Sequence, residues 1–461
     1  MKRKKLLALL LASAMAFGLA ACGNGDTPPA DGSGASSQPT SEEGTPEESS
    51  EEPSESSEAD AEESTEDGSA AADGTFENKV IMGNTTDLTG DFRFPGWGTS
   101  SVGASDQDIG RLTIGYGTQE VAEDGNLVWN DTAVKSHTET ENEDGTATYT
   151  VEINEGLTFS DGTPVTAKNY LATTLSFASP VSMEAGRPGT SGMAFVGYQE
   201  FHDYTGEEAE GTSKEFTGIR LLGDYSFSFT VSSDYYPYYF AYTYAAVDPA
   251  PLGLVLGEGV DILDDGNGVY LSENFYEKNG DSYVKAAEIE ANRYDLTKYP
   301  FSGAYVVSDW DASTKQATMT INPAFKGNYE GQVPSIETIV YVKLTQETQL
   351  EMLTTGGTDI LGGVTGGKDT TAALAVVDGE NFTEVHYQRA GYGKIQFDCD
   401  FGPTMFQEVR QAVTYLLNRT EFCQTFTGGY GVVVDGPYSP DLAPWRAVQD
   451  EIELIDYSFS P

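Results

Sequence analysis

The sequence has few of the residues that bind metals or form disulfides. It contains only three cysteines and three histidines. These are Cys22, Cys399, Cys423, His137, His202 and His386. No C-x-x-C pair occurs, and none of these residues has the spacing of a zinc or haem motif. We therefore expect no metal and no other cofactor. For Cys399 and Cys423, two buried free thiols are favoured over a disulfide between them.

Basic residues are also scarce. The chain has 25 Lys and Arg against 73 Asp and Glu, which gives a formal net charge of −48. A surface of this sign is repelled by nucleic-acid phosphates and by anionic lipid headgroups. We therefore expect no binding to nucleic acid. With so many carboxylates, pairs arise by chance. None is accompanied by a nucleophile elbow or an H-E-x-x-H motif, so a secreted hydrolase is the disfavoured alternative.

Residues 23–75 contain no Lys, no Arg and no large hydrophobic residue. They are mainly Ser, Glu, Gly, Pro, Ala, Asp and Thr, and 16 of them are acidic. Such a segment cannot bury enough apolar surface to offset the entropy lost on ordering. We predict a disordered acidic tether that carries the folded part at a distance from its anchor. An acidic tail that binds a partner is the alternative.

The N-terminus carries a basic and then an apolar segment. Residues 2–5 are basic, and the apolar run at 6–21 is short for a membrane span. The run ends in Leu-Ala-Ala-Cys at residues 19–22, which resembles the bacterial lipobox. We predict a signal peptide at 1–21 and a lipidated Cys22 at the head of a tether that spans 22–75. Ordinary signal cleavage is the alternative. Several acyl chains would anchor the protein stably to the extracytoplasmic face of the membrane, and the tether favours a Gram-positive surface.

Residues 146–177 are the most informative stretch of the chain. Hydrophobic residues alternate with polar ones at Tyr149, Val151 and Ile153, which predicts a half-buried strand. A second short strand is predicted at 157–159, followed by a Ser-Asp-Gly turn at 160–162. Thr166 is placed to cap a helix that begins at Ala167.

The segment FSDGTPVTAKNY at 159–170 resembles a motif of the bacterial solute-binding proteins that serve ABC importers. More narrowly, it is similar to family 5, the oligopeptide- and dipeptide-binding branch. Asn169 stands where the family usually has Asp, at a position expected to be structural. A second match lies at 402–419, where an apolar stripe predicts a helix. The resemblance covers residues 76–461 in order.

The resemblance implies an α/β fold of the two-lobed periplasmic-binding-protein type (class II), with an extra subdomain in lobe I. Lobe I is expected at 76–335, with the inserted subdomain at about 115–225. Lobe II is expected at 336–461, beginning with a crossover strand. Relatives continue beyond this point, so lobe II is expected to be incomplete. In peptide binders of the family, the Asp that pairs with the ligand's α-amino group lies in that further part.

The function that the resemblance implies is binding, without enzymatic activity. The protein would capture a peptide or a similar small solute between its lobes by hinge closure. It would then deliver the solute to the permease and ATPase of an ABC importer. A surface receptor that signals instead of feeding a transporter is the alternative. We expect a monomer held at the membrane by its lipid anchor.

Two segments are expected to face each other across the ligand cleft. One is the loop after a first strand at 79–82, and the other is a strand at 391–398. The candidate ligand-binding residues are Asn84, Thr85, Asp87, Trp97, Tyr116, Tyr392 and Lys394. The tyrosine-rich stretch at 235–244 either lines the cleft or packs a short helix onto a sheet, and packing is favoured. A strand is also predicted at 225–231 from its strict alternation.

Overall fold

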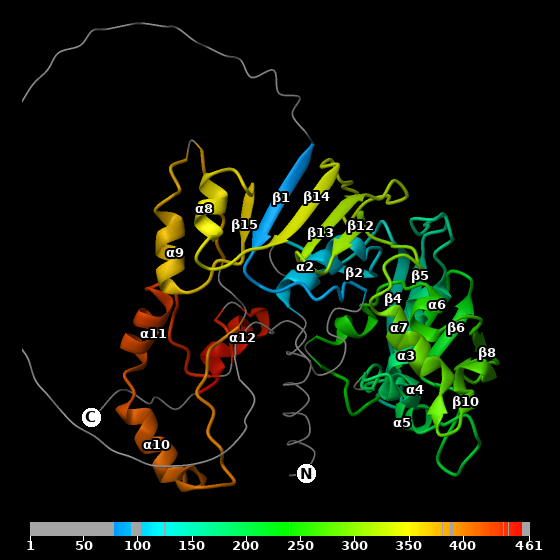
Figure 1. Cartoon of the computed structure of the whole chain (residues 1–461). Coiled ribbons are helices and arrows are strands. Elements are labelled where there is room, and N and C mark those ends of the chain that lie inside the picture. The colour runs from blue at the N-terminus through cyan, green and yellow to red at the C-terminus, as the bar shows by residue number, and fades with distance from the viewer. Residues whose placement is uncertain are drawn as a thin grey trace, which may run out of the picture. The chain divides into compact units, whose positions relative to one another are not determined.

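The computed structural model describes residues 78–453, apart from 94–102, 124–125, 188, 239, 380, 388–390, 437 and 441. The predicted signal peptide, Cys22, the acidic tether and Trp97 lie outside the described residues. Helices and strands are named below as they are labelled in Figure 1.

A five-stranded sheet, the first sheet, contains the N-terminal strand of the described chain (Figure 1). Its order is β12 (Tyr305–Asp311), β13 (Gln316–Ile321), β14 (Thr338–Lys343), β1 (Lys79–Asn84) and β15 (Ile360–Gly362). Strand β1 lies between β14 and β15 and is parallel to both. Strands β12, β13 and β14 alternate in direction. The predicted first strand is thus confirmed and extends to Asn84.

The predicted start of lobe II at residue 336 falls just before β14, a strand of this sheet. Strand β14 pairs with β1 along its whole length, from Lys79 opposite Thr338 to Asn84 opposite Lys343. Strand β15 pairs with the other edge of β1. From Met82 to Asn84, β1 thus has a paired strand on each side. Strands β14 and β15 therefore belong to the same sheet as β1, and the chain leaves this sheet only after Gly362.

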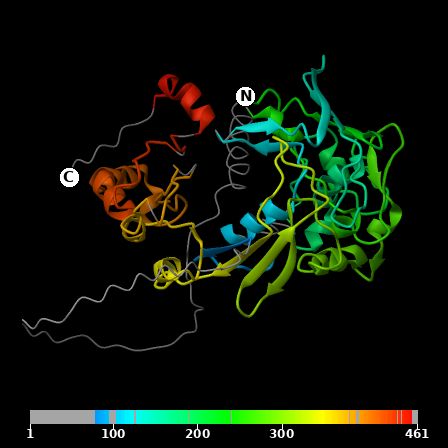
Figure 2. The same ribbon diagram turned by 90° about the horizontal axis from the view of Figure 1, so that it is seen from above.

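Helix α2 (Ala104–Thr113) packs against the first sheet and contacts β12 (Figure 1 and Figure 2). The helix and the sheet share a small hydrophobic core. Its buried residues are Leu88, Phe92, Ile109, Phe301, Tyr305, Val307, Ala317, Met319 and Tyr341. Phe92 meets Trp310 edge-on, with 5.2 Å between the ring centroids. This core fixes the loop after β1, because Leu88 and Phe92 belong to that loop.

A second, antiparallel sheet is built from the middle of the chain. Its order is β4 (Val134–Glu141), β5 (Ala147–Ile153), β7 (Ser226–Val231) and β6 (Ile219–Gly223). Buried and half-buried residues alternate strictly along β5, so Tyr149, Val151 and Ile153 all face the core. The strands predicted from alternation at 149–153 and 225–231 are confirmed.

Helix α3 (Ala167–Ala178) begins where the sequence predicts it, with Thr166 as its N-cap. The side-chain oxygen of Asn169 accepts hydrogen bonds from the Thr166 N–H at 2.8 Å and from the Thr166 hydroxyl at 3.0 Å. The buried residues of α3 join the larger hydrophobic core of the protein. This core extends to Ile289, well past the boundary predicted near 225 for the inserted subdomain. The short strand predicted at 157–159 is only an isolated bridge between Thr158 and Pro164.

Shorter elements complete this part of the chain. They are β2 (Gln119–Val121), β3 (Leu127–Trp129), α4 (Pro180–Glu184), α5 (Tyr198–His202), α6 (Leu252–Leu256), β8 (Ile262–Asp264), β9 (Val269–Leu271), β10 (Lys278–Asn279), β11 (Ser282–Tyr283) and α7 (Val284–Asn292). The tyrosine-rich stretch surrounds a short 3-10 helix at Ala241–Ala245. Tyr235, Tyr236, Tyr238 and Tyr244 pack against the larger core, as the favoured alternative predicts.

The C-terminal part of the described chain is mainly helical. It contains α8 (Gln349–Thr354), α9 (Gly367–Leu374), α10 (Gln407–Leu416), α11 (Arg419–Thr427) and α12 (Ala443–Val448). Helix α10 confirms the helix predicted within 402–419, although none of its residues is buried. The strand predicted at 391–398 does not form. A strand needs a neighbour to satisfy its backbone groups, and none of the described strands pairs with this segment.

Three further findings concern membrane, metal and thiol chemistry. In the described part of the chain, no helix is both long and apolar enough to cross a membrane. The same residues contain no group of three or more His, Cys, Asp or Glu side chains placed to hold a metal ion. Cys399 and Cys423 are both free thiols, but Cys399 is exposed and Cys423 is only partly buried. The prediction that both thiols are buried is therefore wrong.

Candidate ligand-binding site

The three parallel strands of the first sheet end at the same edge. Asn84 is the last residue of β1, Lys343 is the last residue of β14, and Gly362 is the last residue of β15. Asn84 and Lys343 are paired in the sheet register. In open α/β sheets, ligands bind in the crevice beyond the carboxyl ends of the strands. We call this edge, with the loop at 85–90, the strand-end site.

The Asn84 side chain forms the floor of the strand-end site. It is only 4% exposed, and its carbonyl oxygen accepts a hydrogen bond of 2.8 Å from the Thr86 N–H. The amide group lies against Gly363, where an added Cβ would come within 2.9 Å of the Asn84 amide nitrogen. Gly363 also has a positive φ of +71°, which side chains rarely allow. The glycine therefore lets the two strand ends approach closely.

Lys343 holds the loop after β1 from the other side. Its ammonium group donates a hydrogen bond to the Thr85 carbonyl and lies 2.9 Å from the Asp87 carboxylate. The Lys343 side chain is 28% exposed, whereas that of Asp87 is 72% exposed. The charge of Lys343 is therefore half sheltered at the base of the site, while its partner carboxylate reaches into water.

Helix α2 fixes the far end of the same loop through Asp106. The Asp106 carboxylate accepts hydrogen bonds from the Thr89 N–H and hydroxyl, both at 2.9 Å, and from the Gly90 N–H at 3.3 Å. Burial raises the pKa of Asp106, and the bonds from Thr89 and Gly90 oppose that rise. Two of these donors are backbone N–H groups and the third is the Thr89 hydroxyl. Residues 89–90 are therefore held against the helix.

A second carboxylate of α2 contacts β14. The Tyr341 hydroxyl donates to Asp108 at 3.1 Å, and the Tyr341 ring is 1% exposed. Burial raises the pKa of both groups, and the hydrogen bond from Tyr341 opposes the rise for Asp108. Tyr341 lies two residues before the end of β14, so the contact fixes α2 relative to the strand ends.

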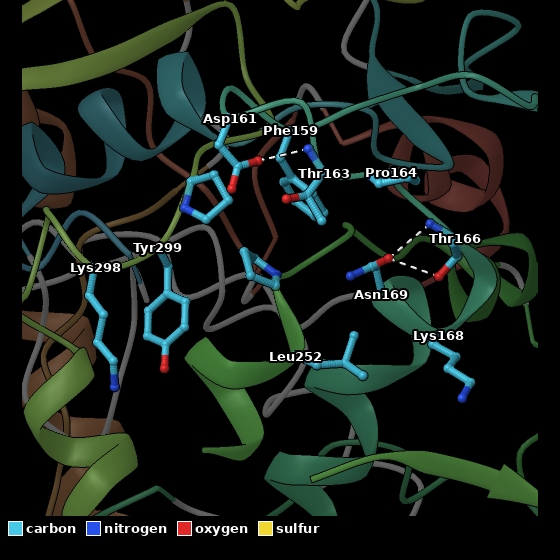
Figure 3. Close-up of a pocket in the computed structure, with 12 residues that line it drawn as sticks. Phe159, Asp161, Thr163, Pro164, Thr166, Lys168, Asn169, Leu252, Lys298 and Tyr299 are labelled. Atoms are coloured by element: carbon cyan, nitrogen blue, oxygen red, sulfur yellow. Dashed lines mark hydrogen bonds between the residues drawn. The ribbon is translucent and has the colours of Figure 1, made fainter. Parts of the chain in front are cut away.

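A cavity of about 410 Å³ lies elsewhere, beside the motif at 159–169 (Figure 3). It is lined by that motif, by Pro251 and Leu252, and by residues 298–300. Its polar groups are engaged within the protein. Asp161 accepts from the Thr163 N–H, and Asn169 caps α3, as the dashed lines in Figure 3 show. Lys168 pairs with Asp261 at 2.6 Å. The polar groups named here thus stabilise the turn and the helix cap, and we do not assign the ligand to this cavity.

Residues 129–456 match the family model of bacterial extracellular solute-binding proteins, family 5, middle region. The chain belongs to this family. The resemblance found in the sequence motifs is thus confirmed. Among curated proteins, no sequence matches the chain.

Solved structures of similar fold include several solute-binding proteins. The oligopeptide-binding protein AppA of Bacillus subtilis, in complex with a nonapeptide, is 18% identical with a TM-score of 0.56, over 83% of this chain and 61% of AppA. Haemophilus influenzae OppA, in complex with RPPGFSPFR, is 17% identical with a TM-score of 0.56, over 84% of this chain and 64% of OppA. Campylobacter jejuni NikZ, in complex with Ni(L-His), is 14% identical with a TM-score of 0.50, over 78% of this chain and 57% of NikZ.

These likenesses confirm the predicted α/β fold of the periplasmic-binding-protein type. The chain spans about three fifths of the length of the solved family 5 relatives. The identities are low, so the relatives establish the fold of this chain and not its ligand.

The structure brings three of the predicted site residues together and separates the others. Asn84, Thr85 and Asp87 all lie at the strand-end site. Tyr116 does not lie there. Its side chain is fully buried in the larger core and stacks on Phe325 at 5.2 Å between centroids.

Tyr392 and Lys394 lie on irregular chain and not on the predicted strand. Both side chains are exposed, and among the described residues no hydrogen bond or ion pair joins either of them to the loop at 85–90. Trp97 lies outside the described residues. The one charged residue that the strand-end site contains and the sequence did not single out is Lys343. Its signal in the sequence is a lysine that interrupts the otherwise apolar run at 339–344.

Proposed function

We propose that this family 5 chain is an extracytoplasmic substrate-binding protein that captures a peptide or a similarly small solute. It would deliver the solute to the permease and ATPase of an ABC importer. The family match over residues 129–456 carries this proposal. It is supported by solved relatives of the same fold, two of which hold peptides.

The ligand is proposed to lie at the strand-end site and to be enclosed by closure of two lobes about a hinge. Asn84, Thr85 and Asp87 are proposed to contact it. Polar groups that converge on a sheltered site orient a ligand, while burial of the remaining ligand surface provides affinity. The role is binding and release, without chemical change of the ligand.

The protein is further proposed to act as a monomer held at the extracytoplasmic face of the membrane through Cys22. Residues 23–75 would then separate the binding domain from the lipid anchor. This arrangement keeps a very acidic domain near an anionic membrane that would otherwise repel it.

Calorimetric titration of the purified chain with a pool of random pentapeptides tests the proposal. A ligand that binds only the folded state raises its stability by about 2.7 kcal/mol when present at 100 times its Kd, so the melting temperature should rise as well. A mixture of the same free amino acids is the control. Peptide capture would be supported if the peptide pool produces a heat of binding and stabilises the protein while the mixture of amino acids does neither. Absence of any response to peptides would overturn it.

A further inference from the structure

Lys343 occupies an unusual place for a lysine. It ends β14, whose preceding residues Ile339 and Tyr341 contribute to the small core. Its side chain lies across the end of β1, where the ammonium group meets the Thr85 carbonyl and the Asp87 carboxylate. The positive charge is therefore held at the base of the strand-end site and not on the outer surface.

Asp87 is a replaceable partner for this charge. Its side chain is 72% exposed, and in the described part of the chain Lys343 is the only partner of its carboxylate. An exposed ion pair contributes little stability, because hydration of the two separated charges nearly compensates for the loss of their attraction. Asp87 can thus leave Lys343 at small cost.

The loop keeps its shape without the Asp87 carboxylate. Asn84 holds it on one side by accepting from the Thr86 N–H, and Asp106 holds it on the other side through Thr89 and Gly90. A movement of the Asp87 side chain therefore leaves the backbone of the site in place.

The charge of the whole chain makes this one lysine important. Acidic residues outnumber basic ones by 73 to 25, so an anionic ligand is repelled unless a cation lies at its binding position. Among the described segments that form the strand-end site, residues 84–90, 343–344 and 360–363, Lys343 is the only lysine or arginine.

We propose that Lys343 binds the carboxylate of the ligand and that Asp87 takes this position when no ligand is present. The inference rests on the proposed capture of peptides and names the group that is recognised, the free carboxyl terminus. The ligand carboxylate displaces Asp87 from Lys343 and accepts a charge-assisted hydrogen bond from the ammonium group, while Asp87 remains in the loop beside the ligand.

The test uses the purified full chain and two pools of random pentapeptides without acidic residues. Both pools have a free amino terminus, and one ends in a carboxylate while the other ends in an amide. We expect the carboxylate pool to bind about tenfold more tightly, as one hydrogen bond to a charged group allows. Lys343→Met should remove this preference. Asp87→Asn should raise the preference for the carboxylate pool over the amide pool severalfold, because the competing carboxylate is gone.

Lys168→Met is the matched control, because Lys168 also pairs with a single Asp, at 2.6 Å, but lies in α3, outside the strand-end site. It should keep the wild-type preference. Asp87→Asn changes an exposed side chain, so it remains informative even if Lys343→Met fails to fold. Equal binding of both pools by the wild type, or a preference that survives Lys343→Met, would overturn the inference and leave peptide capture intact. Binding of neither pool would overturn both.

Discussion

At the scale of single residues, Tyr116 joins parts of the chain that are far apart in sequence. Its hydroxyl donates to the Ala324 carbonyl at 3.1 Å and accepts from the Lys326 N–H at 2.8 Å. Both partners lie just after β13, and the ring stacks on Phe325 between them. One side chain thus fixes the start of the larger core to the segment that leaves the first sheet.

We predict that Tyr116→Phe lowers the free energy of unfolding by about 1–2 kcal/mol, because two backbone groups lose their partner. Chemical denaturation measures this loss. Peptide affinity should not change, since the ring remains in the core. Tyr392→Phe is the control, because the Tyr392 side chain is 43% exposed and its hydroxyl can bond to water. A fall in affinity at unchanged stability would show that Tyr116 does contact the ligand.

The strand-end site could be predicted from the sequence only in part. Asn84, Thr85 and Asp87 follow a recognisable strand, and position alone places them at its carboxyl end. Lys343 was not found, because its contact with Asp87 depends on the parallel pairing of β14 with β1. Parallel strands are joined by long connections, so no local pattern reveals which strands become neighbours. The burial of Tyr116 could not be predicted either, since a tyrosine in a short loop has no periodic pattern that marks it as buried.

At the scale of elements, the helices and strands that local sequence patterns encode are predicted correctly, whereas those that depend on distant neighbours are not. Strand β5 and helix α3 were predicted because alternation and an N-cap are encoded within a few residues. The segment 391–398 alternates in a similar way but remains irregular. Alternation indicates that a segment suits a strand, whereas pairing with a neighbour decides whether the strand exists.

Helix α3 provides the clearest prediction for an element. Asn169 is 5% exposed and accepts two hydrogen bonds from Thr166, while its amide nitrogen donates to the Ala250 carbonyl at 2.9 Å. We predict that Asn169→Ala lowers the free energy of unfolding by about 1–2 kcal/mol, because the cap and the link to Ala250 are both lost.

Thr163→Ala in the preceding turn is the control, because the Thr163 side chain is exposed and its N–H still donates to Asp161. Thermal unfolding of both variants gives the comparison. If Asn169→Ala is as stable as Thr163→Ala, the cap does not stabilise α3, and the resemblance of the motif at 159–170 to family 5 has another physical basis.

At the scale of the whole molecule, charge and attachment are linked. The chain has a formal net charge of −48, so nothing in its overall electrostatics draws it to an anionic membrane. A binding protein that serves an importer must nevertheless stay near the membrane. A covalent lipid at Cys22 would provide the attachment that electrostatics does not.

We predict that Cys22→Ser abolishes attachment. Cells that express this variant should release it into the medium or retain an uncleaved precursor, because the sulfur atom is the acceptor of the lipid. Metabolic labelling with a radioactive fatty acid, followed by fractionation, measures both effects. Cys399→Ser, which removes an exposed thiol of the folded part, is the control and should be labelled like the wild type. Normal labelling and attachment of Cys22→Ser would refute the lipobox prediction.

Residues 23–75 allow a last test, since their predicted role is purely spatial. We predict that deletion of the segment leaves peptide affinity within about twofold of the full chain, because a flexible spacer adds no contact to the ligand. The segment carries 16 acidic residues, so its loss should slightly speed the association of anionic peptides at low ionic strength. Replacing residues 23–75 by a Gly/Ser segment of equal length removes the charge and keeps the length. If the charge is the cause, this variant should show the same faster association as the deletion. Calorimetry at two salt concentrations gives the affinities, and stopped-flow mixing gives the rates. A tenfold loss of affinity on deletion, restored by the native segment but not by Gly/Ser, would show that the acidic segment takes part in binding.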